Sequence, residues 1–311
     1  MNANNIKIYR IALIVAVILA AVSATLISLS FGCYDETIQH FASGAALPVI
    51  AFAVAALAAA PGIAAAVIAR FSPDARLKLH ESKKTTASML YPRFTIAAGF
   101  FAYAIYVFMA SAGENKPATL TIIAAVFAFC SALYFITRAF APKNMVVTAA
   151  MSLFPIGWAI FSILDVYFTK ALALNSPVKS MMLVAYIYMI IFFISEARFA
   201  NRKQTVPFFV FASLAASAAL SVIAPLLYLS AKKVFSGAAP IPAMPLMSAL
   251  LLAIIAVFAL IRAVDTYKGH LRAHDPIKEL ENIEEEAALA AAEAQAEAEA
   301  EAKRNGGNDS K

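Results

Sequence analysis

Asp165 is the acidic residue that reaches furthest into one of the long apolar runs of this chain, about one turn from the end of the run 145–167. An ionisable side chain within the hydrocarbon of a membrane costs about 2.5–3.5 kcal/mol, so its presence points to a function. Its carboxylate could contact a substrate or a cation, or it could reach the lipid headgroups. The basic residues that could pair with it in the neighbouring loops are Lys116, Lys170 and Lys179.

The same run carries Pro155 near its middle, followed by Gly157 and Trp158. Proline removes a backbone donor and clashes with the preceding helical turn, so we expect a kink or a break here. A broken helix can line a cavity in a membrane protein, although prolines also kink helices that only pack. We therefore take Pro155 and Trp158 as candidate pocket residues, with a packing kink as the alternative.

Aromatic residues gather in the middle apolar runs. Ring faces attract cations and also bury apolar ligands, so these residues could line a pocket for an apolar or cationic ligand. Tyr106 and Tyr188 are our candidates among them, and packing between helices or against lipid is the alternative. The group consists of Phe100, Phe101, Tyr103, Tyr106, Phe108, Tyr186, Tyr188, Phe192 and Phe193.

Arg138 and Glu196 occupy equivalent places at the ends of two apolar runs, 118–140 and 181–197. If the two helices are neighbours, the opposite charges would form a structural ion pair near the membrane boundary. The similar run ends also suggest a repeated helical hairpin, although the bias of basic residues toward cytoplasmic loops explains part of the likeness.

Other chemistry is not indicated. His270 and His274 are four residues apart and could share a helix face toward zinc, but no cysteine is near and the glutamate of a metalloprotease motif is missing, so we predict no metal site. Ten glycines in 311 residues leave little from which to build a phosphate-binding loop. We predict no cofactor and no catalytic residue, and an enzyme is the least favoured class.

The elements that position these residues are long apolar helices. The chain is 62% hydrophobic and only 14% charged, far outside the range of soluble domains. A spanning helix needs about 20 mostly apolar residues, and continuous runs exclude the alternation of a membrane barrel. We predict an all-α polytopic membrane protein with eight spans arranged as hairpins. The runs are 8–31, 45–69, 94–112, 118–140, 145–167, 181–197, 206–229 and 246–264.

Lysine and arginine alternate between the loops in a way that predicts orientation. Sixteen basic residues fall on one side and five on the other, and the richer side is the cytoplasmic one. Both termini are then cytoplasmic. Cleavage of the first run as a secretion signal would instead leave seven spans, but that run is longer than the usual signal core of about 7–15 residues. Short loops, and no outward-facing glycosylation sequon, favour a bacterial plasma membrane.

The C-terminal part has a different composition. We divide the chain into a bundle, 1–267, and a cytoplasmic tail rich in alanine and glutamate, 268–311; from residue 275 onward there are eleven acidic and four basic residues. The basic loops of the bundle are explained by topology and by anionic lipid headgroups, so membrane lipids are expected partners and nucleic acid is not. The tail could contact a cytoplasmic partner.

Two functional hypotheses follow. The first is a permease-like protein that binds or moves a small, neutral or apolar solute through the broken fifth run and the aromatic middle runs. The second is a sensory or scaffolding membrane protein without catalytic activity. A central cavity would favour the first hypothesis, and a solidly packed bundle the second.

Overall fold

The computed structural model describes residues 3–35, 37–72, 78–81, 87–112, 117–140, 145–169, 172–173, 175–201, 203–236, 244–267 and 271–274. Within these ranges eight helical segments are long and apolar enough to cross a membrane, which confirms the all-α polytopic fold predicted from the sequence. The tail after residue 274 lies outside the described residues.

Ten α-helices form these eight spans, because the fifth and the seventh spans are each divided into two helices. The helices are α1 (Ala3–Ser30), α2 (Ala46–Phe71), α3 (Ala87–Ser111), α4 (Thr119–Ala139), α5 (Met145–Met151), α6 (Phe154–Phe168), α7 (Pro177–Ala200), α8 (Val206–Ala218), α9 (Leu220–Ser236) and α10 (Leu246–Tyr267). A 3₁₀ turn, η1 (Phe31–Cys33), follows α1, and the strands are β1 (Tyr34–Asp35), β2 (His40–Phe41), β3 (Lys78–Glu81) and β4 (Leu271–His274).

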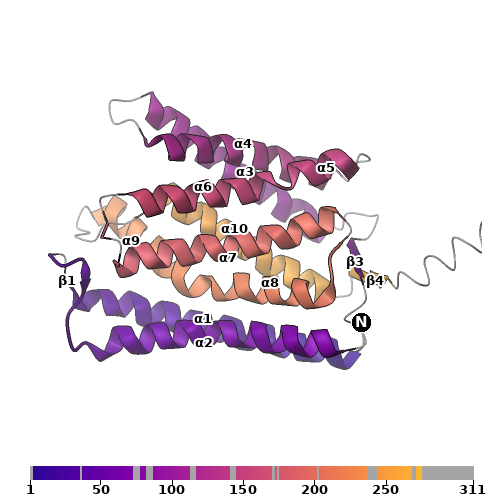
Figure 1. Cartoon of the computed structure of the whole chain (residues 1–311), viewed down its shortest axis with the longest axis horizontal. Helices are drawn as coiled ribbons and strands as arrows, with labels where there is room; N and C mark the ends of the chain where they lie inside the picture. The colour runs from indigo at the N-terminus through magenta and orange to yellow at the C-terminus, as the bar shows by residue number, and fades with distance from the viewer. Residues whose placement is uncertain are drawn as a thin grey trace, which may run out of the picture.

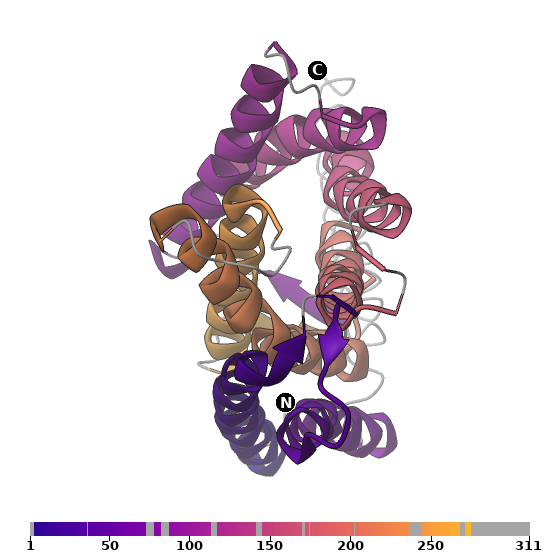
Figure 2. The same ribbon diagram turned by 90° about the vertical axis from the view of Figure 1, so that its left-hand side faces the viewer.

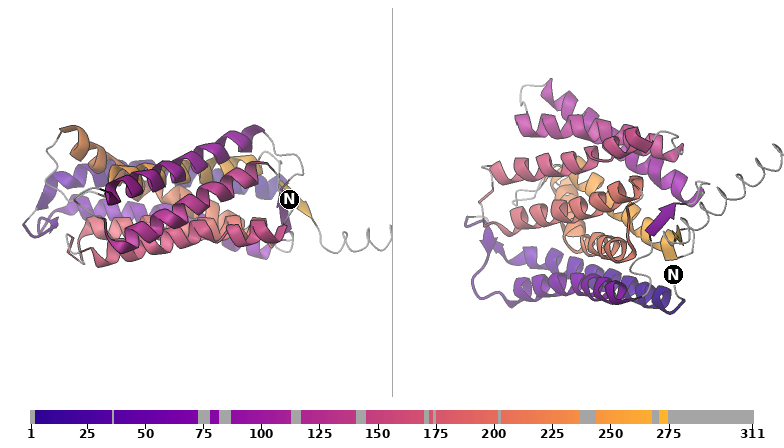
Figure 3. Two further views of the ribbon diagram at one scale, coloured as in Figure 1. Left: turned by 90° about the horizontal axis from the view of Figure 1, so that it is seen from above. Right: turned by 45° about the vertical axis from the view of Figure 1, so that its right-hand side comes forward.

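The helices run roughly parallel along one direction and stack into a flattened bundle (Figures 1 and 3). Seen end-on in Figure 2, α3 and α4 lie at one end of an elongated outline, and α1 and α2 lie at the other. The seventh span, α8 and α9, lies between these ends and contacts α1, α2, α7 and α10. In its most apolar stretch of 18 residues, 78% of the residues are buried, compared with 28% in the corresponding stretches of the first two spans. The seventh span is therefore the core, and the first two present most of their surface outward.

The two ends of the bundle carry different small sheets (Figure 1). We call the end with the N-terminus the N-end and the opposite one the far end. At the far end β1 pairs with β2, and at the N-end β3 pairs antiparallel with β4. The strand β3 is also held by a hydrogen bond from the backbone N–H of Leu79 to the carbonyl of Gln204. Residues Leu271–His274 form the strand β4 and not the helix considered for His270 and His274, and His270 lies outside the described residues.

The fifth span breaks where the proline pattern predicts. The helix α5 ends at Met151, Ser152 and Leu153 form a turn, and α6 begins with Pro155 as its second residue. Proline fits the first turn of a helix because the missing N–H has no intrahelical partner there. Regular bonding resumes at once, since the N–H of Gly157 donates to the carbonyl of Leu153 at 2.9 Å.

Candidate functional site

The face of α6 that turns into the bundle carries Trp158 and Asp165, two of the candidate residues predicted from the sequence. Trp158, Ser162 and Asp165 follow the spacing i, i+4 and i+7, which places all three on one side of a helix. The side chain of Trp158 is fully buried, that of Ser162 is 4% exposed, and Asp165 is partly exposed toward the far end. The sequence therefore arranges a tryptophan, a hydroxyl and a carboxylate in a line from the centre of the bundle to its far end.

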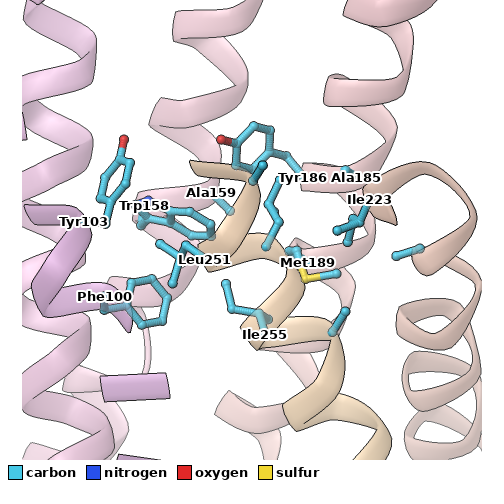
Figure 4. Packing of buried hydrophobic residues seen from close by; sticks show 14 of the residues in the cluster. Phe100, Tyr103, Trp158, Ala159, Ala185, Tyr186, Met189, Ile223, Leu251 and Ile255 are labelled. Carbon is cyan, nitrogen blue, oxygen red and sulfur yellow. The ribbon is translucent and has the colours of Figure 1, made fainter. Parts of the chain in front are cut away.

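Trp158 sits within a ring of aromatic side chains from α3 and α7 (Figure 4). Its ring centroid lies 5.1 Å from that of Phe100, 5.5 Å from Tyr186, 6.2 Å from Tyr103 and 6.2 Å from Phe193, with interplanar angles between 68° and 89°. Edge-to-face contacts of this kind add about 0.5–1.5 kcal/mol each beyond area burial. They also fix the orientation of the single tryptophan of the chain.

Polar groups from four helices, α3, α6, α7 and α10, meet beside the indole. The hydroxyls of Tyr103 and Tyr186 face the side chains of Ser162 on α6 and Ser248 on α10, and Tyr103 also faces the indole of Trp158. Figure 4 shows both tyrosine hydroxyls on the same side of the Trp158 ring. The side chains of these five residues are at most 6% exposed. We call this group the polar-aromatic cluster.

Two donors of the cluster have no hydrogen-bond partner. Trp158 Nε1 and Ser162 Oγ are buried and form no hydrogen bond of normal geometry, although the Tyr103 hydroxyl lies near both. A buried polar group without a partner costs about 1–3 kcal/mol, and in a membrane span lipid offers no substitute. Buried groups of this kind are a place where a water molecule or a solute is favourable.

Asp165 lies one turn further toward the far end. Its side chain is beside the hydroxyl of Thr121 on α4, and no Lys, Arg or His among the described residues forms an ion pair with it. Lys179, one of the expected partners, donates instead to the carbonyls of Thr169 at 3.1 Å and Leu172 at 3.4 Å. The other two expected partners, Lys116 and Lys170, fall outside the described residues.

The remaining pocket candidates lie outside the cluster. Tyr106 on α3 is 46% exposed on the outer surface of the bundle. Tyr188 is on α7 but packs partly buried at the edge of the core, near α1 and α2. Pro155 is buried at the start of α6, where it marks the break that precedes Trp158.

Glu196 forms the clearest ion pair of the bundle, at the N-end, but with a different partner from the one expected. Arg262 on α10 donates from Nε to the Glu196 Oε1 on α7 at 3.0 Å, and both side chains are at most 5% exposed. The predicted pair with Arg138 is therefore corrected. The reason is helix placement: α7 contacts α10, whereas Arg138 ends α4, which packs on α3 and α6.

The surroundings of this pair are also buried. The guanidinium of Arg262 stacks over the ring of Phe199 at 4.5 Å, and Gln204 Nε2 donates to Ser195 Oγ next to Glu196. Arg138 instead offers its backbone carbonyl to Arg93 Nη1 at 3.0 Å. The Glu196–Arg262 pair thus ties α7 to α10 at the N-end, opposite to Asp165.

Some residues of these sites were not predicted from the sequence. Ser162 could have been found from its spacing between Trp158 and Asp165. Ser248 has no such signal, because one serine near the start of an apolar run is common. Arg262 was interpreted only as a basic residue at a cytoplasmic span end, and its burial depends on how α7 and α10 pack.

The fold and these sites define an integral membrane protein with a buried polar-aromatic cluster between its helices. No protein-family model, no curated protein and no solved structure matches this chain.

Proposed function

We propose that this protein is a permease-like membrane protein that binds a small solute in the polar-aromatic cluster. The observation that supports the proposal best is the pair of unpartnered donors, Trp158 Nε1 and Ser162 Oγ, buried among tyrosine and serine hydroxyls in the middle of the spans. A solute with a hydrogen-bond acceptor would satisfy donors that the protein leaves open. The half-buried Asp165 then lies on the way from the far end to the cluster.

The broken fifth span adds a second argument. Transporters commonly bind their substrates where a spanning helix is discontinuous, because the freed backbone and the adjacent side chains face a cavity rather than lipid. Here the break at Ser152 and Leu153 comes one turn before Trp158 on the same span. A movement of α6 about this break would change the surroundings of the cluster without disturbing α5.

The direction of the path follows from charge. Basic loops at the N-end support a cytoplasmic position for that end by the positive-inside bias, and in this proposal the far end with Asp165 faces the outside of a plasma membrane. A solute would enter past Asp165 and leave past the Glu196–Arg262 pair. Opening the N-end would require that buried pair to separate or to move as a unit.

A second candidate function is the sensory or scaffolding one. The observation that favours it is the β3–β4 sheet, which joins the loop between α2 and α3 to Leu271–His274 at the start of the tail. A tail fixed to the bundle in this way could report a change in the helices to a cytoplasmic partner.

Accessibility of Ser162 distinguishes the two. In a background with Cys33 and Cys130 replaced by serine, the variant Ser162→Cys should react with a small trimethylammonium methanethiosulfonate reagent from the far end, and from the N-end in a transport cycle. Ser217→Cys is the matched control, because Ser217 is fully buried in α8 and bonds to the carbonyl of Ser213 at 2.9 Å. We expect Ser162→Cys to react at least tenfold faster than this control. Reaction at the rate of the control from both sides would contradict the permease and favour a packed scaffold.

A further inference from the structure

We propose that the solute of the polar-aromatic cluster is a small organic cation that carries a hydrogen-bond acceptor. This inference rests on the proposed function, because it names the chemical class of the ligand for the same site. It is drawn from the carboxylate of Asp165, from the aromatic faces around Trp158 and from the one indole donor without a partner.

Two carboxylates in the spanning helices have described side chains, and they differ in whether the protein supplies their counter-charge. Glu196 has its counter-charge within the protein, since Arg262 lies at 3.0 Å. Asp165 has a hydroxyl neighbour, Thr121, and no cationic partner among the residues that the structure describes. A membrane carboxylate usually pairs with a cation or faces a water-filled path. Among the described residues Asp165 thus has no counter-charge, and a cationic solute can supply one.

The aromatic residues around Trp158 indicate which kind of cation fits the site. Tyr103 and Tyr186 flank the indole of Trp158 (Figure 4), at centroid distances of 6.2 and 5.5 Å. Faces of tryptophan and tyrosine attract an organic cation by about 0.5–2 kcal/mol each, more where water is excluded. An inorganic ion would instead need a shell of oxygen ligands in place of rings. The rings thus favour an organic ammonium over a metal ion.

The unpartnered donor Trp158 Nε1 indicates that the ligand also holds a hydrogen-bond acceptor. An ammonium group cannot accept a hydrogen bond, and the Trp158 Nε1 only donates. A ligand that satisfies the indole as well as Asp165 must therefore hold an acceptor, such as a hydroxyl or ether oxygen, close to its charged nitrogen. The serine hydroxyls of Ser162 and Ser248 can either donate or accept and adapt to it.

Fluorescence of the single tryptophan tests this assignment directly, because Trp158 is the only tryptophan in the chain. The purified protein in detergent is titrated at constant ionic strength with choline, and with 3,3-dimethylbutan-1-ol, its neutral isostere with carbon in place of nitrogen. We expect choline to change the emission of Trp158 saturably and the neutral isostere to bind at least tenfold more weakly. Sodium chloride should not reproduce the choline response.

Three variants separate the carboxylate from the rest of the site. Asp165→Asn should weaken choline binding at least tenfold and leave the affinity for the neutral isostere unchanged, and Asp165→Glu should restore most of the choline affinity. Asp35→Asn is the matched control, because Asp35 lies exposed at the same end outside the spans; it should bind choline as the wild type does. A thermal melt of each variant confirms that it is folded.

The outcomes separate the two proposals. Equal affinity for both probes, unaffected by Asp165→Asn, would overturn the cation assignment and leave a neutral-solute site. A response to sodium equal to that of choline would overturn the organic part. Absence of any choline response would overturn the cation assignment whatever the reactivity of Ser162→Cys, and the proposed function fails only if that cysteine is also unreactive.

Discussion

Asp165 and Glu196 are carboxylates of the same bundle that lie in opposite electrostatic environments. The carboxylate of Glu196 is neutralised by Arg262 and surrounded by protein. That of Asp165 is partly exposed, and among the described residues it has a hydroxyl and no cationic group beside it. A buried ion pair is retained for geometry more than for net stability, since desolvation offsets most of its attraction. Under the proposed function, Glu196 has a structural role and Asp165 faces the ligand.

Breaking the Glu196–Arg262 pair tests the structural role. Arg262→Leu or Glu196→Leu alone leaves one buried charge without its counter-charge and should destabilise the protein by about 3–5 kcal/mol. The double variant should lose much less than the sum of the two, because no unpaired charge remains. The measurement is unfolding in detergent, and Arg70→Leu, at an exposed helix end, is the control with little change. Additive losses would show that the two groups do not interact.

At the scale of elements, the position of α6 depends on a glycine. A Cβ atom at Gly157 would clash with the ring of Phe127 on α4. That ring stacks on Phe161 with a centroid distance of 5.2 Å. The glycine thus allows α4 and α6 to approach closely next to the helix break. The same approach sets the depth at which Trp158 enters the cluster.

Gly157→Ala should therefore displace the Phe127 ring and destabilise the protein by about 1–3 kcal/mol, as overpacking does. Adding Phe127→Leu should recover part of the loss. Gly32→Ala is the control, since nothing lies within 4 Å of a Cβ at that position. The measurement is the melting temperature, together with the emission maximum of Trp158. A neutral Gly157→Ala with unchanged emission would show that α4 and α6 are not closely packed here.

For the whole molecule, orientation can be measured with cysteines on the two ends. Ile38 is 59% exposed between β1 and β2 at the far end, and Asn201 is exposed after α7 at the N-end. In the background without Cys33 and Cys130, an impermeant maleimide on intact cells should label Ile38→Cys alone, and permeabilised cells should label both. Labelling of Asn201→Cys in intact cells would reverse the orientation and the direction of the proposed path.

The eight spans were predictable because each apolar run is long enough to cross a bilayer by itself, so no tertiary information was needed. Asp165, Pro155 and Trp158 were noticeable as a charge, a helix breaker and a lone indole within apolar sequence. The predicted partner of Glu196 was wrong because several spans end in an arginine, among them Arg138 and Arg262. The sequence does not show which of these helices contact each other. Ser248 joins the cluster only through the packing of α10 on α3 and α7.

Uptake by proteoliposomes tests most directly the claim that a solute crosses this bundle through the polar-aromatic cluster. Liposomes containing the wild-type protein should accumulate labelled choline faster than protein-free liposomes. Asp165→Asn should slow that uptake at least tenfold, while Asp35→Asn should leave it unchanged. Wild-type liposomes that take up choline no faster than protein-free liposomes, although Trp158 responds to it, would contradict transport and leave a binding protein.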